Sequence, residues 1–394
     1  MISSTFERHF GAPPDVLVRA PGRVNLLGGH TDYNEGFVLP VAIDRAAWVA
    51  ARRLHAPEAR VAALDVGETA TFALEPLTPR AGEWADYPRG VAWALQAAGH
   101  PTVGMEAALT STVPVGAGLS SSAAVEVAFA WAWRTLAGLN IERAAVARIC
   151  QRAENDYVGV KCGIMDQMAS ACGQEGHALL LDCRTLEVAP VPLPAGVAIL
   201  VADTGVRRAL AASAYNERRR ECEEAVRILS QHLPGLRALR DVSPDDFRRT
   251  AHYLPEVVRK RARHVVTDNA RVLEAVAALQ TGDLARVGDA MRRCHVSLRD
   301  DYAVSSPELD LLAETAWAVE GCYGARLTGA GFGGCAVALT DEGAVEGLVA
   351  ALETAHLAAF DRTPAIYRCK AAEGVAATVY SPGSEKTSAE KSNR

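Results

Sequence analysis

The sequence is poor in features that would place this chain in a membrane, on nucleic acid or in an oxidising compartment. None of its apolar runs reaches the length needed to span a bilayer, and the first ten residues lack the cationic start and apolar centre of a signal peptide. The formal net charge is −6, and no basic patch offers a footprint for nucleic acid. We therefore expect a cytoplasmic protein that binds neither membranes nor nucleic acid.

Cysteine usage points the same way. The nine cysteines are odd in number, scattered and never arranged as Cys-x-x-Cys. Such usage is typical of reduced thiols in packed positions and argues against a disulfide framework or a cysteine zinc site. Hydrophobic residues make up 49% and charged residues 22% of the 394 residues, which is ordinary for a globular chain long enough for two domains.

A boundary between two domains is indicated by a proline-rich turn at residues 190–194, which precedes a predicted strand at 197–202. We expect an N-terminal domain over residues 1–185 and a C-terminal domain over 186–380. The tail, 381–394, is small, polar and charged, so its composition predicts disorder.

The most informative stretch of the chain is the glycine- and serine-rich segment 115–124, VGAGLSSSAA, which runs directly into an apolar helix. Glycines let a backbone approach a ligand closely, and the free amides of a helix start attract anions. The helix is predicted over 122–137, ends at Gly138 and carries Glu126 as its only acidic side chain. No lysine follows the glycines, which argues against an ordinary Walker A loop. A phosphate-binding turn and a plain serine-capped helix both remain open on these residues alone.

Several other elements can be expected from the pattern. Residues 16–19 and 38–43 read as strands, with a functional turn region at 20–36 between them. A helix begins after Asn140 and carries Glu154 at the border of its buried stripe, where a surface glutamate with a packed stem is the ordinary alternative.

Asp166 falls in the first turn of a short predicted helix, 163–171, where the helix dipole favours an ionised carboxylate.

Arg218, Arg219 and Arg220 precede three glutamates, which predicts an exposed helix face with paired charges. Further helices are expected at 215–230, 267–280 and 306–320. Residues 329–334 formally satisfy G-x-G-x-x-G, but they precede a strand-like run instead of a helix, so a dinucleotide-binding fold is not supported.

Three blocks, in this order, resemble the motifs of the GHMP small-molecule kinases. They are APGRVNLLGGHTDYNEG at 20–36, GAGLSSSAA at 116–124 and LTGAGFGGC at 327–335. The first block, followed by VLPVAIDR, is similar to the galactokinase signature, and CGIMDQMAS, RKRARHV and SLRDDYAVSSPELD also look like galactokinase. The resemblance implies an α+β, two-domain GHMP-kinase fold with the active site in the cleft between the domains.

The resemblance also implies roles for individual residues. ATP phosphates would be wrapped by Gly116, Ala117, Gly118, Leu119, Ser120, Ser121 and Ser122. Ser122 and Glu154 would hold Mg²⁺, which prefers hard oxygen ligands. Asp166 would accept the proton of the anomeric hydroxyl, with Arg23 beside it. The sugar would be bound by His30, Asp32, Gly163 and Tyr215.

The implied activity is ATP-dependent phosphorylation of galactose to galactose 1-phosphate in galactose catabolism, by a monomer. One departure concerns the sugar, because Gly28-Gly29-His30 stands where galactokinases usually have Gly-Glu-His. Losing that charged hydrogen bond to the 6-hydroxyl costs about 1.5 to 3 kcal/mol if nothing replaces it. L-Arabinose or galacturonate is therefore an alternative substrate. A non-catalytic sugar sensor is a second alternative, against which the complete set of Arg23, Ser122, Glu154 and Asp166 argues.

Overall fold

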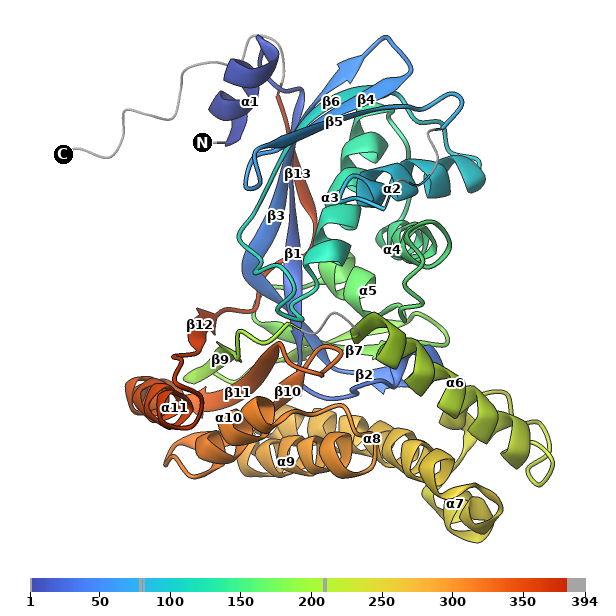
Figure 1. Ribbon diagram of the computed structural model, residues 1–394, viewed down its shortest axis with the longest axis vertical. Coiled ribbons are helices and arrows are strands. Elements are labelled where there is room, and N and C mark those ends of the chain that lie inside the picture. Colours follow the sequence, from blue (N-terminus) through green and yellow to red (C-terminus); the bar gives the residue numbers. More distant parts are fainter. Residues whose placement is uncertain (1, 78–79, 81, 208–210, 381–394) are drawn as a thin grey trace.

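A six-stranded sheet forms the upper part of the protein in the computed structural model, which describes residues 2–77, 80, 82–207 and 211–380 (Figure 1). Its strands, in spatial order, are β13 (Ala376–Val379), β1 (Val16–Asn25), β3 (Pro40–Leu54), β6 (Gly104–Ser111), β4 (Glu58–Ala63) and β5 (Glu68–Ala73). All neighbours are antiparallel except β4 and β6.

Side chains along each strand point alternately to the two faces of this sheet, and apolar residues occur on both faces. Helices therefore cover both faces. The helices of this part are α1 (Ile2–Phe10), α2 (Asp86–Ala97), α3 (Ser121–Leu136), α4 (Arg143–Arg152) and α5 (Met165–Cys172). α3 and α5 contact β1 and β3, while α2 and α4 pack on α3. The opposite face is covered by α1, whose Phe6 packs on Ala50 and Ala108.

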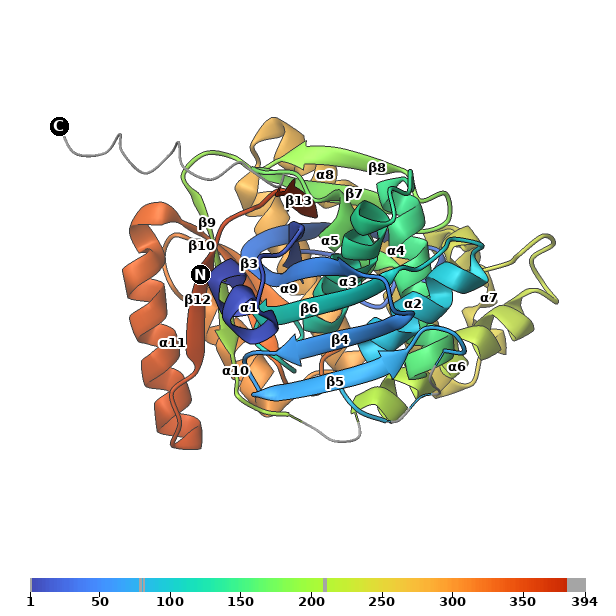
Figure 2. The ribbon, with the colours of Figure 1, turned by 90° about the horizontal axis from the view of Figure 1, so that it is seen from above.

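The lower part contains an antiparallel four-stranded sheet and a group of helices (Figure 1). Its strands, in spatial order, are β10 (Cys322–Thr328), β11 (Cys335–Asp341), β9 (Val197–Asp203) and β12 (Ala365–Cys369). The helices are α6 (Ala211–Leu229), α7 (Pro244–Thr250), α8 (Glu256–Thr281), α9 (Leu284–Asp300), α10 (Pro307–Trp317) and α11 (Val345–Phe360). α7 and α11 lie at opposite ends of this part in both ribbon views (Figure 2).

Two connections join the parts. β2 (Phe37–Val38), β7 (His177–Asp182) and β8 (Val188–Pro192) form a small sheet that contacts β3 on one side and α8 on the other. β13, near the end of the described chain, returns to pair with β1. The predicted α+β class with two domains is confirmed. The boundary at residue 185 stays a prediction, and the predicted disordered tail lies outside the described residues.

The strand predictions were right in position and wrong in length. β1 continues past Arg19 to Asn25, so the predicted turn region at 20–36 is extended strand in its first part. The strand survives there because its register shifts between Pro21 and Arg23, which accommodates a proline without an amide donor. The strand predicted at 38–43 is split at Leu39 between β2 and β3.

The helices also occur where the pattern predicted them, although α8 begins at Glu256, eleven residues before the predicted start at 267. α3 spans Ser121–Leu136 and is followed by Gly138 at φ +65, as a helix stop requires. The exposed-face prediction is wrong for Arg218, which is 9% exposed and donates from Nε to the Tyr302 carbonyl at 2.8 Å. Arg219 is paired with Glu223 at 3.1 Å as expected.

One helical segment, Glu342–Phe360, is apolar and long enough by composition alone to cross a bilayer, contrary to the expectation that no run would be. It contains Glu346 and Glu353, whose charges are costly inside a bilayer. The segment contacts α10 and β9 through α11. Length and hydropathy alone therefore do not make this segment a membrane span.

Candidate active site

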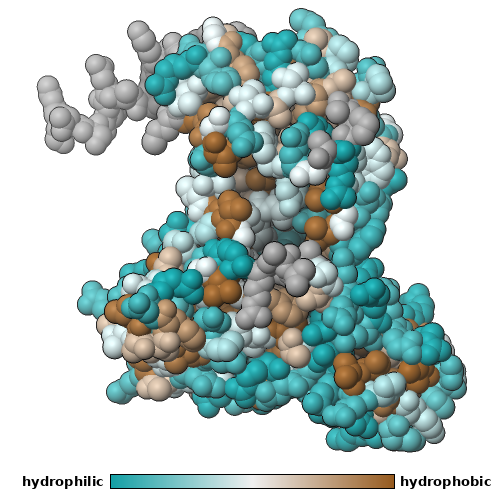
Figure 3. All heavy atoms as spheres, viewed as in Figure 1, coloured by the Kyte–Doolittle hydropathy of each residue, from teal (hydrophilic) through white to brown (hydrophobic). Residues whose placement is uncertain are grey.

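The surface is hollowed at a waist between the two parts (Figure 3). A cavity of about 190 Å³ lies between β1 and α5 on one side and α6 and the loop after β10 on the other. It is lined by Arg23, His30, Asp32, Glu154, Val160, Cys162, Gly163, Met165, Asp166, Tyr215, Gly329 and Ala330. The fold thus brings together seven of the predicted site residues from segments far apart in the sequence.

A bidentate ion pair forms one wall of the cavity. Arg23 Nε donates to Asp166 Oδ1 at 2.8 Å and Arg23 Nη2 donates to Asp166 Oδ2 at 2.9 Å. Arg23 Nη1 donates to the Gly118 carbonyl at 2.7 Å. The Arg23 side chain is 4% exposed and that of Asp166 27% exposed. The arginine is therefore fixed by the loop at Gly118 and by α5, while the Asp166 carboxylate at the start of α5 remains open to the cavity.

His30 stands on the floor of the cavity with both ring nitrogens already bonded within the protein. Its Nε2 lies 3.1 Å from the Ala330 carbonyl, which can only accept, so Nε2 carries the proton. Its Nδ1 lies 2.9 Å from the Tyr33 hydroxyl and accepts from it, because burial lowers the pKa of His30 to about 3 and keeps the ring neutral. His30 thereby joins the first motif to the loop after β10.

Asp32 begins a short 3₁₀ helix, Asp32–Asn34, and turns its carboxylate toward the cavity. Burial, followed by the nearby charge of Asp166, raises the pKa of Asp32 to about 6, against the lowering effect of the Tyr33 amide and of Arg23. The carboxylate packs directly on the backbone of Gly163, where a side chain would overlap it. Both residues therefore meet at one place, as predicted.

Tyr215 of α6 closes the opposite side of the cavity. Its ring lies 5.4 Å from that of His30 and 5.3 Å from that of Tyr33, measured between centroids. His30 and Tyr215 line the cavity, and the Tyr33 ring packs against both of them. The predicted position of Tyr215 beside the other sugar-site candidates is thus observed.

The glycine-serine loop lies beside the cavity and packs on the loop after β10. A Cβ atom added at Gly329 would lie 2.7 Å from the Gly118 carbonyl oxygen, so the two loops touch through glycine backbone. Ala117 and Leu119 are fully buried and face the core. Only the backbone of these two residues can therefore meet a ligand.

The start of α3 does not fit the serine-capped helix that the pattern left open. Ser120 occupies the cap position at φ +60, and its side chain makes no capping hydrogen bond. Its hydroxyl oxygen is buried without a hydrogen-bond partner in the described part of the chain. The first amides of α3 thus lack the side-chain acceptor that a structural cap supplies.

Ser122 and Glu154 meet at the end of the cavity nearest this loop. Ser122 Oγ donates to Glu154 Oε1 at 3.2 Å, and Gln167 Nε2 donates to Glu154 Oε2 at 2.8 Å. Glu154 is 6% exposed, so the surface alternative for it is wrong. It lies in a π-helical turn, Ala153–Val158, which widens the helix and turns the carboxylate inward. Burial, and then the charge of Asp166, raises the pKa of Glu154 to about 7.

Two partners of this cluster were missed in the sequence. Gln167 Nε2 also donates to Glu126 Oε2 at 3.2 Å, and both side chains are fully buried. Burial, and then the charge of Glu154, raises the pKa of Glu126 well above its usual range. The available signal was that Glu126 is the only acid in an otherwise apolar helix, which calls for a buried partner.

Gly29, the departure noted in the sequence, does not line the cavity. A Cβ atom added at Gly29 would lie 2.8 Å from Arg326 Nη2 and 3.3 Å from the Leu298 methyl carbons. The position therefore faces packed side chains of the lower part, and its missing side chain leaves no open space beside the other site residues.

Family comparisons agree with this geometry. The chain matches the galactokinase galactose-binding signature over residues 4–53, the GHMP kinase N-terminal domain over 86–174 and the GHMP kinase C-terminal domain over 275–359. It is 52% identical over 370 residues to a galactokinase of Roseiflexus sp. (strain RS-1), covering 94% of this chain and 95% of that protein. It is 47% identical over 377 residues to a galactokinase of Chloroflexus aggregans, covering 95% and 96%.

Solved structures show the same relationship. The crystal structure of Lactococcus lactis galactokinase complexed with galactose superposes with a TM-score of 0.92 at 34% identity, covering 95% of this chain and 98% of that one. A mevalonate kinase, at 17% identity and a TM-score of 0.62, shares the fold. With this extent of identity over nearly its whole length, the chain belongs to the galactokinase family of the GHMP kinases.

Proposed function

We propose that this protein transfers the terminal phosphoryl group of ATP to the anomeric hydroxyl of galactose, giving galactose 1-phosphate and ADP. The observation that carries the proposal is the ion pair of Arg23 and Asp166, which faces the same small cavity as the partly open carboxylate of Asp32. The superposition with a galactokinase that was crystallised with galactose supports the choice of sugar.

In this proposal Asp166 accepts the proton of the anomeric hydroxyl as that oxygen attacks phosphorus. Arg23 orients the carboxylate through two hydrogen bonds, so that its position is set before substrate arrives. The same guanidinium favours the negative charge that develops between the attacking oxygen and the phosphoryl group.

The sugar is oriented by the floor of the cavity. Asp32 accepts hydrogen bonds from two neighbouring hydroxyls, which distinguishes an axial from an equatorial hydroxyl. Tyr215 and the backbone at Gly163 bound the ring on either side. His30 contributes the carbon edge of its ring and holds Ala330 in place, since both its nitrogens are engaged.

ATP binds with its phosphates on the backbone of residues 116–122, where glycine conformations and the free amides of α3 favour anions. Ser122 and Glu154 fit one Mg²⁺ ion, because a hydroxyl and a carboxylate lie 3.2 Å apart in a buried, acid-rich place that a cation would neutralise. No cluster of three His, Cys, Asp or Glu side chains is placed to hold a metal in the described ranges. Mg²⁺ needs few protein ligands, and held by Ser122 and Glu154 it would supply positive charge to the phosphates.

We also propose that the protein acts as a cytoplasmic monomer. All nine cysteines are free thiols, which is the usual state in a reducing compartment.

The test is a coupled assay for ADP with galactose, N-acetylgalactosamine, L-arabinose and galacturonate at equal concentration, with the product identified by phosphorus NMR. We expect galactose to give the highest kcat/KM and an anomeric phosphate. ADP release no faster with any sugar than without one would contradict the proposal and indicate a sugar sensor. A higher kcat/KM for L-arabinose or galacturonate would reassign the substrate.

A further inference from the structure

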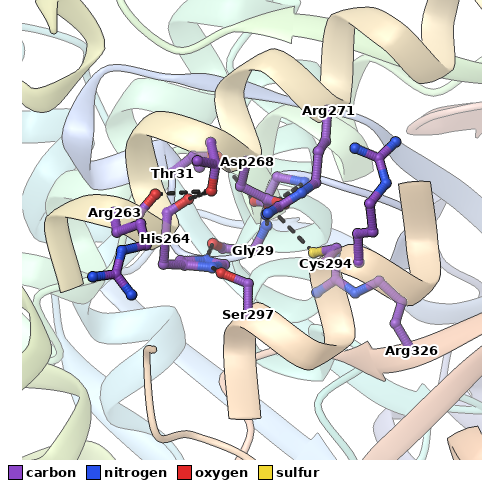
Figure 4. A network of polar contacts seen from close by, with 12 residues as sticks. Gly29, Thr31, Arg263, His264, Asp268, Arg271, Cys294, Ser297 and Arg326 are labelled. Atoms are coloured by element: carbon purple, nitrogen blue, oxygen red, sulfur yellow. Dashed lines mark hydrogen bonds and ion pairs between the residues drawn. The ribbon is translucent and has the colours of Figure 1, made fainter. Parts of the chain in front are cut away.

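A fully buried carboxylate of the lower part reaches across to the turn that carries the sugar-site residues (Figure 4). Asp268 of α8 accepts two hydrogen bonds on Oδ2, from the Gly28 amide at 3.1 Å and the Gly29 amide at 3.0 Å. Asp268 does not line the cavity. Its contacts with the site therefore run through the backbone of this turn.

His264 precedes Asp268 by four residues on α8 and hydrogen-bonds the Gly29 carbonyl of the same Gly28-Gly29 turn. His264 Nε2 lies 2.8 Å from the Gly29 carbonyl oxygen, which can only accept, so Nε2 is the donor. His264 Nδ1 lies 2.9 Å from Ser297 Oγ. Burial lowers the pKa of His264, so the ring is neutral and Nδ1 accepts from the serine. One face of α8 thus supplies both an acceptor and a donor to the turn.

The remaining polar group of the turn is bonded as well. The Gly28 carbonyl accepts from Asn25 Nδ2 at 3.1 Å and from Thr31 Oγ1 at 3.0 Å. Both amides and both carbonyls of Gly28 and Gly29 are therefore satisfied by side chains, in a segment without regular secondary structure. Because buried backbone groups must find partners, these side chains decide the conformation of the turn.

Steric contacts leave the turn little freedom to settle elsewhere. Gly28 has φ +83, and a Cβ atom there would lie 2.7 Å from the Val38 Cα atom. Gly29 is bounded on its other side by Arg326 and Leu298. His30, the next residue, has φ +61, a conformation that requires support from its surroundings.

Asp268 has two further side-chain partners, Arg271 and Cys294, which form no hydrogen bonds with the turn. Its Oδ1 pairs with Arg271 Nη1 at 3.3 Å, and Cys294 Sγ donates to Oδ2 at 3.3 Å. The two amides and the thiol share one oxygen, and the thiol contact can be removed by itself through substitution of Cys294, because the other two donors are backbone amides.

We infer that Asp268, supported by His264, is a positioning residue that fixes the Gly28-Gly29 turn and so sets where His30 and Asp32 stand against the sugar. The inference rests on the proposed function and deepens it. It assigns part of the sugar affinity to a residue that touches neither sugar nor ATP. A residue that only joined the two parts of the fold would affect stability and leave sugar affinity unchanged.

The experiment compares Asp268→Ala, Asp268→Asn and Cys294→Ala with the wild type, in the full-length chain. Galactose binding is measured by calorimetry without ATP, and KM for galactose, KM for ATP and kcat are measured with Mg²⁺. Cys294→Ala is the matched control, because it removes a contact to the same carboxylate oxygen and leaves both amide bonds intact.

We expect Asp268→Ala to raise the dissociation constant and KM for galactose at least tenfold, with KM for ATP within twofold of the wild type. Asp268→Asn keeps an amide oxygen that can accept from the turn, so its galactose KM should rise about threefold. Cys294→Ala should stay within twofold for both substrates.

A galactose KM within twofold of the wild type in Asp268→Ala, with a lowered melting temperature, would overturn the inference in favour of a structural role. An equal rise in both KM values would also overturn it. If Asp268→Ala does not fold, Asp268→Asn decides, and an unchanged galactose KM there is the contrary result. Failure of the proposed function is separate, since the wild type itself would then neither bind nor phosphorylate galactose.

Discussion

The Asp32 carboxylate lies directly on the Gly163 backbone, so closely that a methyl group on residue 163 would overlap Oδ2. Asp32 comes from the segment after β1, and Gly163 comes from the segment before α5. Glycine at 163 is thus required by the space that the carboxylate occupies, and the two segments bound the cavity together.

Gly163→Ala should therefore displace the Asp32 carboxylate and raise KM for galactose by about tenfold or more, because an error of about 1 Å in placement costs up to about a hundredfold. Steady-state kinetics with galactose varied at saturating ATP measures this. Gly347→Ala is the control, because a Cβ there meets nothing within 4 Å in α11. Equal galactose KM values for the two variants would disprove the packing argument.

Galactose affinity should weaken as pH falls through about 6. The raised pKa of Asp32, about 6, means that the carboxylate gains a proton below this pH and loses an acceptor for sugar hydroxyls. His30, with its pKa lowered to about 3, does not titrate in this range. Calorimetric titration of galactose between pH 5 and 8 should show the loss. Asp32→Asn should bind weakly with a flat profile, and a profile as steep as that of the wild type would exclude Asp32 as its source.

Asp166→Asn should lower kcat by about a hundredfold to ten-thousandfold, since it removes the proton acceptor while keeping the shape of the side chain. Galactose and ATP binding, measured by calorimetry, should change little. Asp156→Asn is the control, because Asp156 is exposed and lies outside the cavity lining. Near-normal turnover in Asp166→Asn would rule out its role as base.

Ser122→Ala should raise the Mg²⁺ concentration needed for half-maximal activity by about tenfold, because one of two oxygen ligands is lost. Mn²⁺ binding, followed by electron paramagnetic resonance in the presence of ADP, gives a readout independent of turnover. Ser230→Ala, at an exposed residue directly after α6, should leave both unchanged. An unaltered metal requirement in Ser122→Ala would remove Ser122 from the metal site.

Tyr302→Phe should destabilise the protein by about 1 to 3 kcal/mol, because it removes two buried hydrogen-bond contacts of the Tyr302 hydroxyl. The Tyr302 hydroxyl donates to the Tyr33 hydroxyl at 2.7 Å, because the proton of the Tyr33 hydroxyl is already donated to His30. The Tyr302 hydroxyl also lies 3.1 Å from Cys222 Sγ. Urea unfolding measures the difference. Tyr253→Phe, 47% exposed, should change stability by less than about 0.5 kcal/mol. A loss no larger at Tyr302 than at Tyr253 would mean that the hydroxyl chain adds nothing.

Local pattern predicted the elements that depend on local physics. Apolar runs bounded by turn residues indicated β1 and β9, and the glycine after an apolar stripe marked the end of α3 at Gly138. The first turn of α5, with Asp166 in it, was also predicted correctly. The full length of β1 was missed, because a proline and a glycine within it resemble a turn until a register shift on the neighbouring strand accommodates them.

By itself, the sequence determined the order of the three motifs, the class of fold and which residue types could carry phosphoryl-transfer chemistry. Only the tertiary structure decided that Glu154 is buried beside Ser122, that both His30 nitrogens are engaged, and that Asp268 holds a turn 240 residues away. The physical reason is that burial and hydrogen-bond partners across such separations depend on how helices and sheets pack, which local propensity does not encode.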